Sequence, residues 1–461
     1  MKGPASRILE TRAACSGCAN TVTGRTMPIR HDSSGRSYYR PSAFYIWFRE
    51  DVLDPDTGQP LPHGLWTFMH EYGHLLQDLC SVYGAIDFIH FLDSVHATKR
   101  AVRHMGEAVT LPLTDDPSAI DDPWYFAQPR LRRAVEPRET WGSGTPWAYE
   151  GYCLEAATID AESQPVMVAK AKFVDNISGE IMHHSVGPWE IKEAYSVALQ
   201  VLFADDEPVL ESTSFEYVAI DRILATVGLH TPRQRIAMCH WALQHPTPGP
   251  HLFNLLDGFS DMGQNSTDPS GEEVYDWCRR HTLAATYDRT VAQITATLKE
   301  FVEHHAAAGD EDPLLVALRW YQEIALLSLA RNRNGERRFP LDRLPDPESP
   351  EQSLDVRPLF EEVPLPSMED AQGQVFAGGR ETPGEQAVFL IRSMAHLVQS
   401  LRSEEAARWM CPLYSCCDAP QRAETCMREP WTIRGTRRCP YDAAQLYLDL
   451  DGRTLQPAPT D

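Results

Sequence analysis

The sequence predicts a helix-rich α+β fold with a small sheet, followed by a C-terminal helical module that contains cysteines. Apolar residues recur at helical spacing in most segments from residue 65 onward. Strand patterns are fewer: an aromatic, β-branched run at 43–49 and alternating runs at 166–186. Of the 11 cysteines, five fall at 411–439. These observations indicate one long mixed region and a short cysteine-containing end.

Composition limits the class of protein. The chain has 461 residues, of which 43% are hydrophobic, enough for a sizeable core. Its 42 Lys and Arg against 65 Asp and Glu give a net charge of −23, which disfavours nonspecific nucleic-acid binding. No apolar run reaches the roughly 18 residues of a membrane helix, and the first residues lack the apolar stretch of a conventional signal peptide. We therefore expect a cytoplasmic protein that contacts neither nucleic acid nor membrane.

The first 40 residues predict a flexible basic arm, because they are polar, rich in Arg and Ser, and without apolar periodicity. Cys15 and Cys18 form a C-x-x-C pair there. No second pair follows at zinc-ribbon spacing, so ordinary thiols and metal or redox use both stay open. Residues 43–49 then predict a strand, and residues 54–58 predict the turn that follows it.

Residues 65–79 predict an amphipathic helix that carries His70-Glu71-Tyr72-Gly73-His74. On a helix the two imidazoles stand one turn apart and can converge on one metal ion. Glu71 leaves the same turn at another angle, where a base for a metal-activated water belongs. The apolar face of this helix consists of Leu65, Phe68, Met69, Tyr72, Leu75, Leu76 and Leu79.

Two further features of this helix predict its surroundings. Gly73 costs about 1 kcal/mol relative to Ala inside a helix. We therefore expect a close neighbour there, such as the backbone of a packed strand. Gln77 and Asp78 lie one turn after the motif. Either could hydrogen-bond the histidines and fix their tautomers.

Residues 86–105 predict a second helix, whose His90, His96 and His104 we interpret as surface or satisfied histidines rather than ligands. Residues 110–146 lack a period and contain Pro, Asp, Arg and Trp, which predicts an irregular insertion over the site entrance. Residues 166–186 predict a hairpin that turns at 175–179.

A helix from Trp189 to Phe203 follows, and Glu193 lies among its buried positions. An unpaired carboxylate there would be costly unless it met a metal or a donor, so Glu193 is the leading candidate for a third ligand. Tyr195, His183 and His184 are candidate donors to a developing oxyanion. The competing third ligands are Glu190, Glu150, Glu155, His183 and His184.

At 70–74 the sequence resembles the zincin metallopeptidases, in which this motif supplies two zinc ligands and the catalytic glutamate. A Glu on a second helix, here 193 − 74 = 119 residues later, resembles the gluzincin arrangement of two His and one Glu. The stretch 187–194 is also similar to uncharacterised bacterial H-E-x-x-H proteins. The resemblance implies that the strand at 43–49 is an edge strand that pairs with substrate backbone, although a core strand is equally compatible.

The rest of the chain predicts helices, a linker and a cysteine cluster. Pro and acidic residues make 336–382 a linker or wrapping loop, and a final helix spans about 383–410. The predicted helices before the linker are 215–227, 231–243, 272–305 with breaks, and 312–331. The clustered thiols are a candidate structural zinc site, with free thiols or an iron-sulfur cluster as alternatives. They are Cys411, Cys416, Cys417, Cys426 and Cys439.

The expected organisation is an arm at 1–40, a zincin-like region at 41–335, a linker at 336–382 and a C-terminal module at 383–461. Within the second region, 41–110 contains the strand and the motif helix, 110–146 the insertion, 147–210 the hairpin and the helix with the third ligand, and 211–335 a helical subdomain. The resemblance implies a metalloprotease in which His70, His74 and Glu193 bind Zn²⁺ and Glu71 is the base. We expect it to act on a restricted cytosolic protein target. A regulatory protein partner is possible. Alternatives are a non-haem iron oxygenase that modifies peptides and a catalytically silent adaptor.

Overall fold

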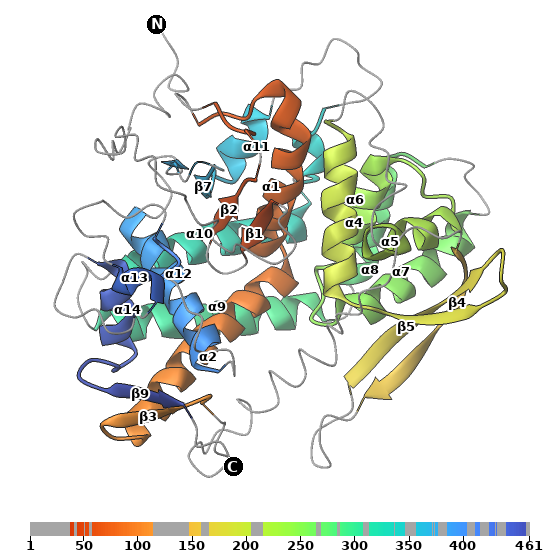
Figure 1. The fold of residues 1–461 in the computed structure, drawn as a ribbon. Coiled ribbons are helices and arrows are strands. Elements are labelled where there is room, and N and C mark those ends of the chain that lie inside the picture. The colour runs from red at the N-terminus through yellow and green to blue at the C-terminus, as the bar shows by residue number, and fades with distance from the viewer. Residues whose placement is uncertain are drawn as a thin grey trace, which may run out of the picture.

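The computed structural model is helix-rich, with small sheets between and beside the helices (Figure 1). The residues it describes are 37–40, 44–49, 51–54, 58–113, 147–157, 166–203, 215–263, 269–283, 286–307, 313–335, 337–345, 356–370, 372, 374–376, 385–402, 411–414, 424–428, 430 and 439–457. Most of the predicted arm, with Cys15 and Cys18, and most of the predicted insertion at 110–146 lie outside these residues.

The motif helix forms as predicted, and most other predicted helices form within a few residues of their expected bounds. The described helices are α1 (Leu65–Cys80), α2 (Val82–His104), α4 (Pro188–Val201), α5 (Phe215–Ala225), α6 (Pro232–Ala242), α7 (Pro248–Gly263), α8 (Gly271–Leu283), α9 (Tyr287–Ala306), α10 (Pro313–Asn334), α11 (Arg357–Glu362), α12 (Glu385–Leu401), α13 (Thr425–Arg428) and α14 (Pro440–Tyr447). Helix α7 was not predicted.

The first sheet has the strand order β1-β2-β7-β8. Its members are β1 (Tyr38–Arg40), β2 (Tyr45–Trp47), β7 (Ser367–Glu369) and β8 (Val375–Phe376). The predicted strand at 43–49 is therefore an interior strand, antiparallel to β1 and parallel to β7. Among the described residues, β1 is the edge strand on that side. β7 comes from the predicted linker, which thus adds a strand to the sheet.

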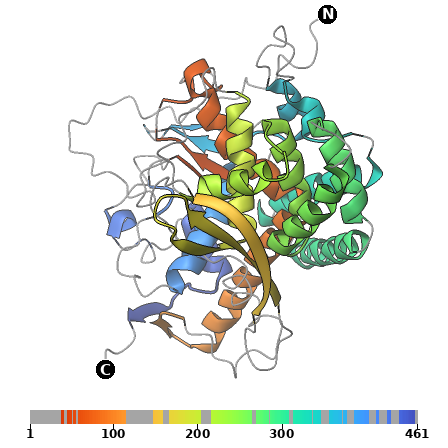
Figure 2. The same cartoon turned by 90° about the vertical axis from the view of Figure 1, so that its right-hand side faces the viewer.

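The predicted hairpin forms from β5 (Val166–Asp175) and β6 (Ile181–Val186). A third strand, β4 (Trp147–Ala157), pairs antiparallel with β5 and was not predicted. Figure 2 shows this curved sheet beside the helices, with β4 against α5 and β5 against α7. The hairpin leads directly into α4, so it sets where α4 begins.

Helix α1 packs against α4, and Gly73 lies where the two helices approach closely. A Cβ atom at position 73 would be 2.8 Å from the Ser196 Oγ and 3.3 Å from the Ser196 Cα. The expectation of a strand beside Gly73 is therefore wrong, because the neighbour is helix α4. A small residue on each helix lets the two polar faces meet.

Helix α2 begins after a sharp break at Ser81, whose hydroxyl accepts a hydrogen bond from the Gly84 N–H. Within the described residues, no single helix has the length and apolar composition to cross a membrane. Only α1 with its preceding turn and α2, taken together, meet that criterion, and they are bent by 81° at the break.

The C-terminal segment returns to the N-terminal half of the chain. Strand β9 (Thr454–Pro457) pairs in parallel with β3 (Ala108–Leu111), directly after α2. One hydrophobic cluster contains buried side chains from α1, α4, α10, α12 and α14, including Leu76, Leu199, Leu318, Met394 and Tyr441. The C-terminal helices thus share a core with the motif helix.

Candidate metal centre

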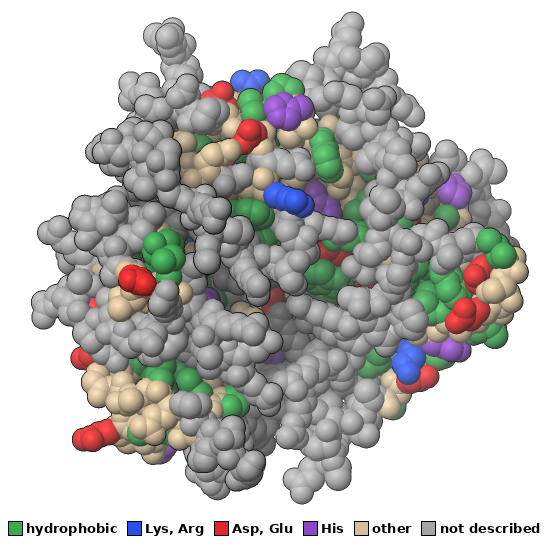
Figure 3. Space-filling view, in the orientation of Figure 1, with side chains coloured by type: hydrophobic (Ala, Val, Ile, Leu, Met, Phe, Trp, Pro, Cys, Tyr) green, Lys and Arg blue, Asp and Glu red, His purple; other side chains and the backbone are tan. Residues whose placement is uncertain are grey.

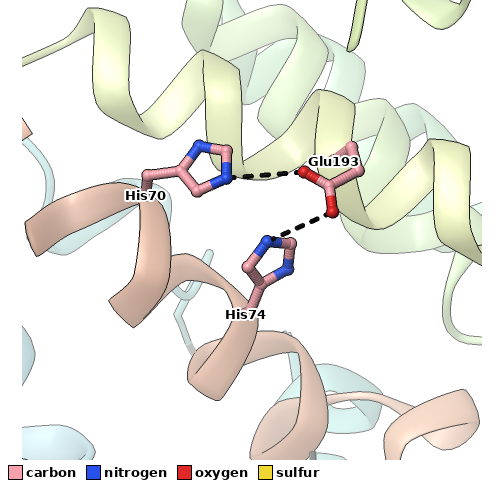
Figure 4. Close-up of side chains that lie close together, drawn as sticks. All are labelled: His70, His74 and Glu193. Atoms are coloured by element: carbon pink, nitrogen blue, oxygen red, sulfur yellow. Dashed lines mark ion pairs between the residues drawn. The ribbon is translucent and has the colours of Figure 1, made fainter. Parts of the chain in front are cut away.

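Three side chains from two helices converge on one point. The Nε2 of His70 lies 3.4 Å from one carboxylate oxygen of Glu193, and the Nε2 of His74 lies 3.6 Å from the other (Figure 4). One ligand atom from each residue lies within 4.8 Å of the other two. Among the described residues, this is the one group of three His, Cys, Asp or Glu side chains that meets this condition. The third residue is the one that the sequence favoured.

The convergence follows from two matched polar stripes. On α1 the stripe is His70, Gly73, His74 and Gln77, and on α4 it is Glu193, Ser196 and Gln200. Residues three, four and seven apart share one face of an α-helix, so each stripe is continuous. Most of the other buried positions of both helices are apolar, with Glu71, Asp78 and Glu190 as the polar exceptions. The two stripes therefore form a polar seam between the helices.

The donor set fits a divalent metal ion. Glu193 is only 3% exposed, and its Oε2 accepts no hydrogen bond from the described residues. A buried carboxylate oxygen without a donor is costly unless a cation compensates it. Two imidazole nitrogens and a carboxylate oxygen are the ligands that catalytic zinc sites use. Burial raises the pKa of Glu193, whereas His74 and His70 lower it when they are protonated.

Two glutamines orient the imidazoles. The Nδ1 of His70 lies 3.0 Å from the Gln200 Oε1, and the Nδ1 of His74 lies 3.3 Å from the Gln77 Oε1. The Gln77 amide nitrogen donates to the Lys192 carbonyl at 2.8 Å, which identifies its other atom as the oxygen. An acceptor at Nδ1 requires the proton there, so each Nε2 keeps its lone pair for a metal.

Of the two polar residues after the motif, only Gln77 contacts a histidine. Asp78 instead forms an ion pair with Lys192 at 2.7 Å. This pair also joins α1 to α4, and the Tyr321 hydroxyl donates to the Asp78 carbonyl at 3.1 Å. Asp78 therefore helps to hold the two helices together rather than to orient an imidazole.

Glu71 is buried beside the three converging residues. Burial and the nearby charge of Glu193 together raise the pKa of its carboxyl to about 7, against the opposing effects of His70 and the Tyr39 backbone N–H. The Tyr39 backbone N–H donates a hydrogen bond to this carboxylate. Because Tyr39 belongs to β1, this hydrogen bond ties the edge strand of the sheet to the motif helix.

Aromatic rings border the two imidazoles. The Tyr39 ring stacks near His74 with centroids 6.5 Å apart, and the Tyr217 ring lies 6.2 Å from His70. Sequence reasoning missed Tyr217: its helix, α5, was predicted, but nothing in the sequence connects that helix to the motif. His70 and His74 are partly exposed. Histidines are among the side chains that reach the surface on the face drawn in Figure 3.

The competing carboxylates have other partners. Glu190 caps α4 by accepting a hydrogen bond from the Gly187 N–H at 2.8 Å. Glu150 pairs with Lys172 at 2.7 Å, and Glu155 pairs with Lys170 at 2.6 Å, both on the exposed surface of the sheet. The structure brings none of these three to His70 and His74.

The predicted oxyanion donors also lie elsewhere. Tyr195 is two residues after Glu193, so it leaves α4 on nearly the opposite side, and its pKa is raised by burial and by core neighbours such as Cys80. His184 is fully buried, 3.5 Å from Glu190. His183 is exposed on β6, where it contributes to lowering the pKa of Glu155.

Three of the five clustered cysteines are described. Cys411 and Cys426 are buried, and the Cys411 N–H donates to the Cys426 carbonyl at 2.8 Å. Cys439 is half-buried. Within the described residues these thiols do not join a three-ligand group. Cys416 and Cys417 lie outside those residues, so the structural zinc site stays a prediction.

The chain was compared with protein-family models, with curated proteins and with solved structures, and none of these comparisons found a match.

Proposed function

We propose that this protein is a zinc-dependent peptidase whose metal is held by His70, His74 and Glu193. The observation that carries the proposal is the convergence of these three side chains with a buried carboxyl, Glu71, beside them. A scaffold protein would have no use for a second carboxyl, one that holds no metal, in such a place. We also propose that residues 41–335 form a zincin-like region and that residues 383–461 form a C-terminal module that contains cysteines.

Each nearby side chain has a role in this chemistry. Bound zinc would polarise a peptide carbonyl and make water more acidic. Glu71 takes a proton from a water molecule as that water attacks the carbonyl carbon, and then delivers the proton to the leaving nitrogen. The C–O bond forms and the C–N bond breaks, so no oxidant or other co-reactant is needed. We assign Tyr217 as the hydroxyl donor to the developing oxyanion, because its ring lies beside His70.

The edge strand β1 supports a peptide as the substrate. Among the described residues β1 forms an edge of its sheet, it packs against the motif helix, and the Tyr39 backbone N–H acts on Glu71. An extended peptide that paired with this edge would lie next to Glu71. We further propose a restricted cytosolic protein target, because an unrestricted peptidase would damage its host. Indiscriminate digestion of casein would contradict this restriction.

The test combines metal analysis with a search for cleavage. Elemental analysis of the wild type should find zinc at the site, and Glu193→Ala should lose it. A peptide library should be cleaved by the wild type and left intact by a zinc-loaded Glu71→Gln variant. Iron in place of zinc, with oxygen-dependent modification of the peptides, would overturn the proposal in favour of an oxygenase. A zinc-loaded wild type that cleaves no peptide would also contradict it.

A further inference from the structure

A second cluster of metal-binding side chains lies where α2, α9 and α14 meet (Figure 1). The Nε2 of His96 is 3.4 Å from the Nε2 of His305. The Tyr447 hydroxyl is 3.2 Å from each of these two nitrogens. Three potential ligand atoms from three helices therefore form a nearly equilateral triangle, which shares no residue with the first site.

The size of this triangle matches metal coordination. A tetrahedral ion with bonds of about 2.0–2.1 Å separates its ligand atoms by about 3.3–3.4 Å. We propose that His96, His305 and Tyr447 bind a divalent first-row transition metal ion, zinc or copper, as two imidazoles and a phenolate. The fourth position would be open to water or to His304, whose ring lies 5.6 Å from that of His96.

Hydrogen bonding alone explains only part of the triangle. A Tyr447 O–H donated to one imidazole and an N–H donated from the other imidazole to the Tyr447 oxygen account for two sides. The third side joins the two imidazole Nε2 atoms at 3.4 Å, so the triangle has three short sides but only two hydrogens to fill them when both imidazoles are neutral. Three short sides are what a shared cation produces, because all three lone pairs then point inward.

The triangle is largely shielded from solvent. His305 is 3% exposed, and His96 and Tyr447 are partly buried. Lys99 and Arg100 also face this group, and the Lys99 Nζ lies 4.3 Å from the centre of the Tyr447 ring. Bound as a phenolate, Tyr447 would offset one charge of the ion.

The ion would connect segments that are distant in the sequence. α2 follows the motif helix directly, whereas α14 lies in the C-terminal segment. The same segments are already joined by the β3–β9 pair and by the Arg453 guanidinium, which donates to the Val102 carbonyl. The role that follows is structural: metal at this site would stabilise the docking of the C-terminal segment onto α2.

The experiment isolates the second site by removing the first. In a His70→Gln/His74→Gln background, the full-length protein is titrated with Zn²⁺ and with Cu²⁺, and bound metal is counted by elemental analysis. We expect one equivalent of either ion, an upward shift of the melting temperature with Zn²⁺, and a phenolate-to-copper charge-transfer band in the visible spectrum. Adding Tyr447→Phe should abolish the band and weaken binding at least tenfold, while the ring that packs on His305 is kept.

Two further variants make the outcome decisive. His96→Gln should lose the metal equivalent, whereas His104→Gln, on the exposed end of the same helix, should keep both metal and band. The proposal is overturned if the background protein binds no stoichiometric metal. It is equally overturned if the equivalent survives both Tyr447→Phe and His96→Gln, for instance because it is lost only when the C-terminal cysteines are changed to Ser. None of these outcomes depends on peptidase activity.

Discussion

Gly73 and Ser196 lie in close contact between the two helices that carry the candidate ligands. A Cβ at position 73 would stand 2.8 Å from the Ser196 hydroxyl oxygen, closer than side-chain carbons come in folded proteins. That hydroxyl accepts a hydrogen bond from the Gln77 amide at 3.2 Å, and Gln77 in turn orients His74. The spacing between the helices and the orientation of a ligand are therefore coupled through one serine.

Replacing Gly73 by Ala should lower metal affinity and stability, although alanine is the better helix former by about 1 kcal/mol. Overpacking of a close contact costs about 1–3 kcal/mol and would move α4 or turn the Ser196 hydroxyl away from Gln77. Zinc affinity and urea unfolding would measure both effects. Combining Gly73→Ala with Ser196→Gly should recover part of the loss, with Ser196→Gly alone as the control. A Gly73→Ala protein that is more stable than the wild type and binds zinc equally well would contradict this account.

Glu71→Gln should keep the metal and lose at least about 10² in rate, because it removes the proton acceptor but no ligand. Glu193→Gln should instead lose metal. The matched control is Glu150→Gln, which removes an exposed carboxylate paired with Lys172 and should leave both properties intact. Metal content and cleavage of a peptide found with the wild type are the two measurements. Loss of metal in Glu71→Gln would make Glu71 a ligand rather than a base.

Gln200→Leu should weaken zinc binding about 10–100-fold, because the His70 Nδ1 then loses the acceptor that keeps its proton in place. Gln200→Glu should bind zinc at least as well as the wild type, since a carboxylate accepts the same hydrogen bond. Competition with a chelator of known affinity measures both variants. Equally weakened zinc binding in Gln200→Leu and Gln200→Glu would mean that position 200 acts through packing alone.

Tyr217→Phe should lower the rate of peptide cleavage by about 10²–10³ without changing metal content or substrate KM, as expected for a donor that acts only in the transition state. The change removes one oxygen and keeps the ring beside His70. Tyr149→Phe, on the neighbouring sheet, serves as a control for the loss of a phenol. An unchanged rate in Tyr217→Phe would leave the oxyanion donor to another residue.

Buried histidines should make the fold sensitive to acid. Burial lowers the pKa of His240 to about 4, and burial together with His245 lowers that of His251 to about 3. Their pKa in the unfolded chain is about 6.5, so the unfolded state binds protons first. Their contribution to stability is fully present above pH 6.5 and is lost as the pH falls toward 4.

Urea unfolding at pH 7.5 and pH 5 would measure this loss. His240→Gln should show a smaller decrease between the two pH values than the wild type, because one titrating group is gone. The exposed His104 provides the control variant, His104→Gln, which should behave as the wild type does. An identical decrease in all three proteins would assign the acid sensitivity to other groups.

Local patterns in the sequence predicted the elements that carry the candidate site. The apolar spacing at 65–79 predicted the motif helix, and the position of the histidines in it predicted two imidazoles on one face. The alternating run and its turn predicted the β5–β6 hairpin. These features depend on neighbours within a few residues, so the chain order alone contains them.

The tertiary structure decided everything that depends on contacts across long separations. Its expected burial made Glu193 the leading candidate for the third ligand. Only the packing of α4 on α1 shows that Glu193, and not Glu190, lies beside the histidines, because Glu190 caps its own helix. The choice of β1 as the edge strand required β7, more than 300 residues later, to occupy the other side of β2. Positions 193, 196 and 200 share one face of α4, but nothing near them in the sequence identifies their partners on α1.

The same reason explains the residues that sequence reasoning set aside. His96 was interpreted as an ordinary surface or satisfied histidine, because nothing near it in the chain suggests a ligand. Folding places it 3.4 Å from His305 and 3.2 Å from Tyr447, residues that lie on two other helices. By itself, then, the sequence determined most of the helices and which side chains share a face of each one. Tertiary packing decided which faces meet, because side chains far apart in the chain become neighbours only when the core closes around them.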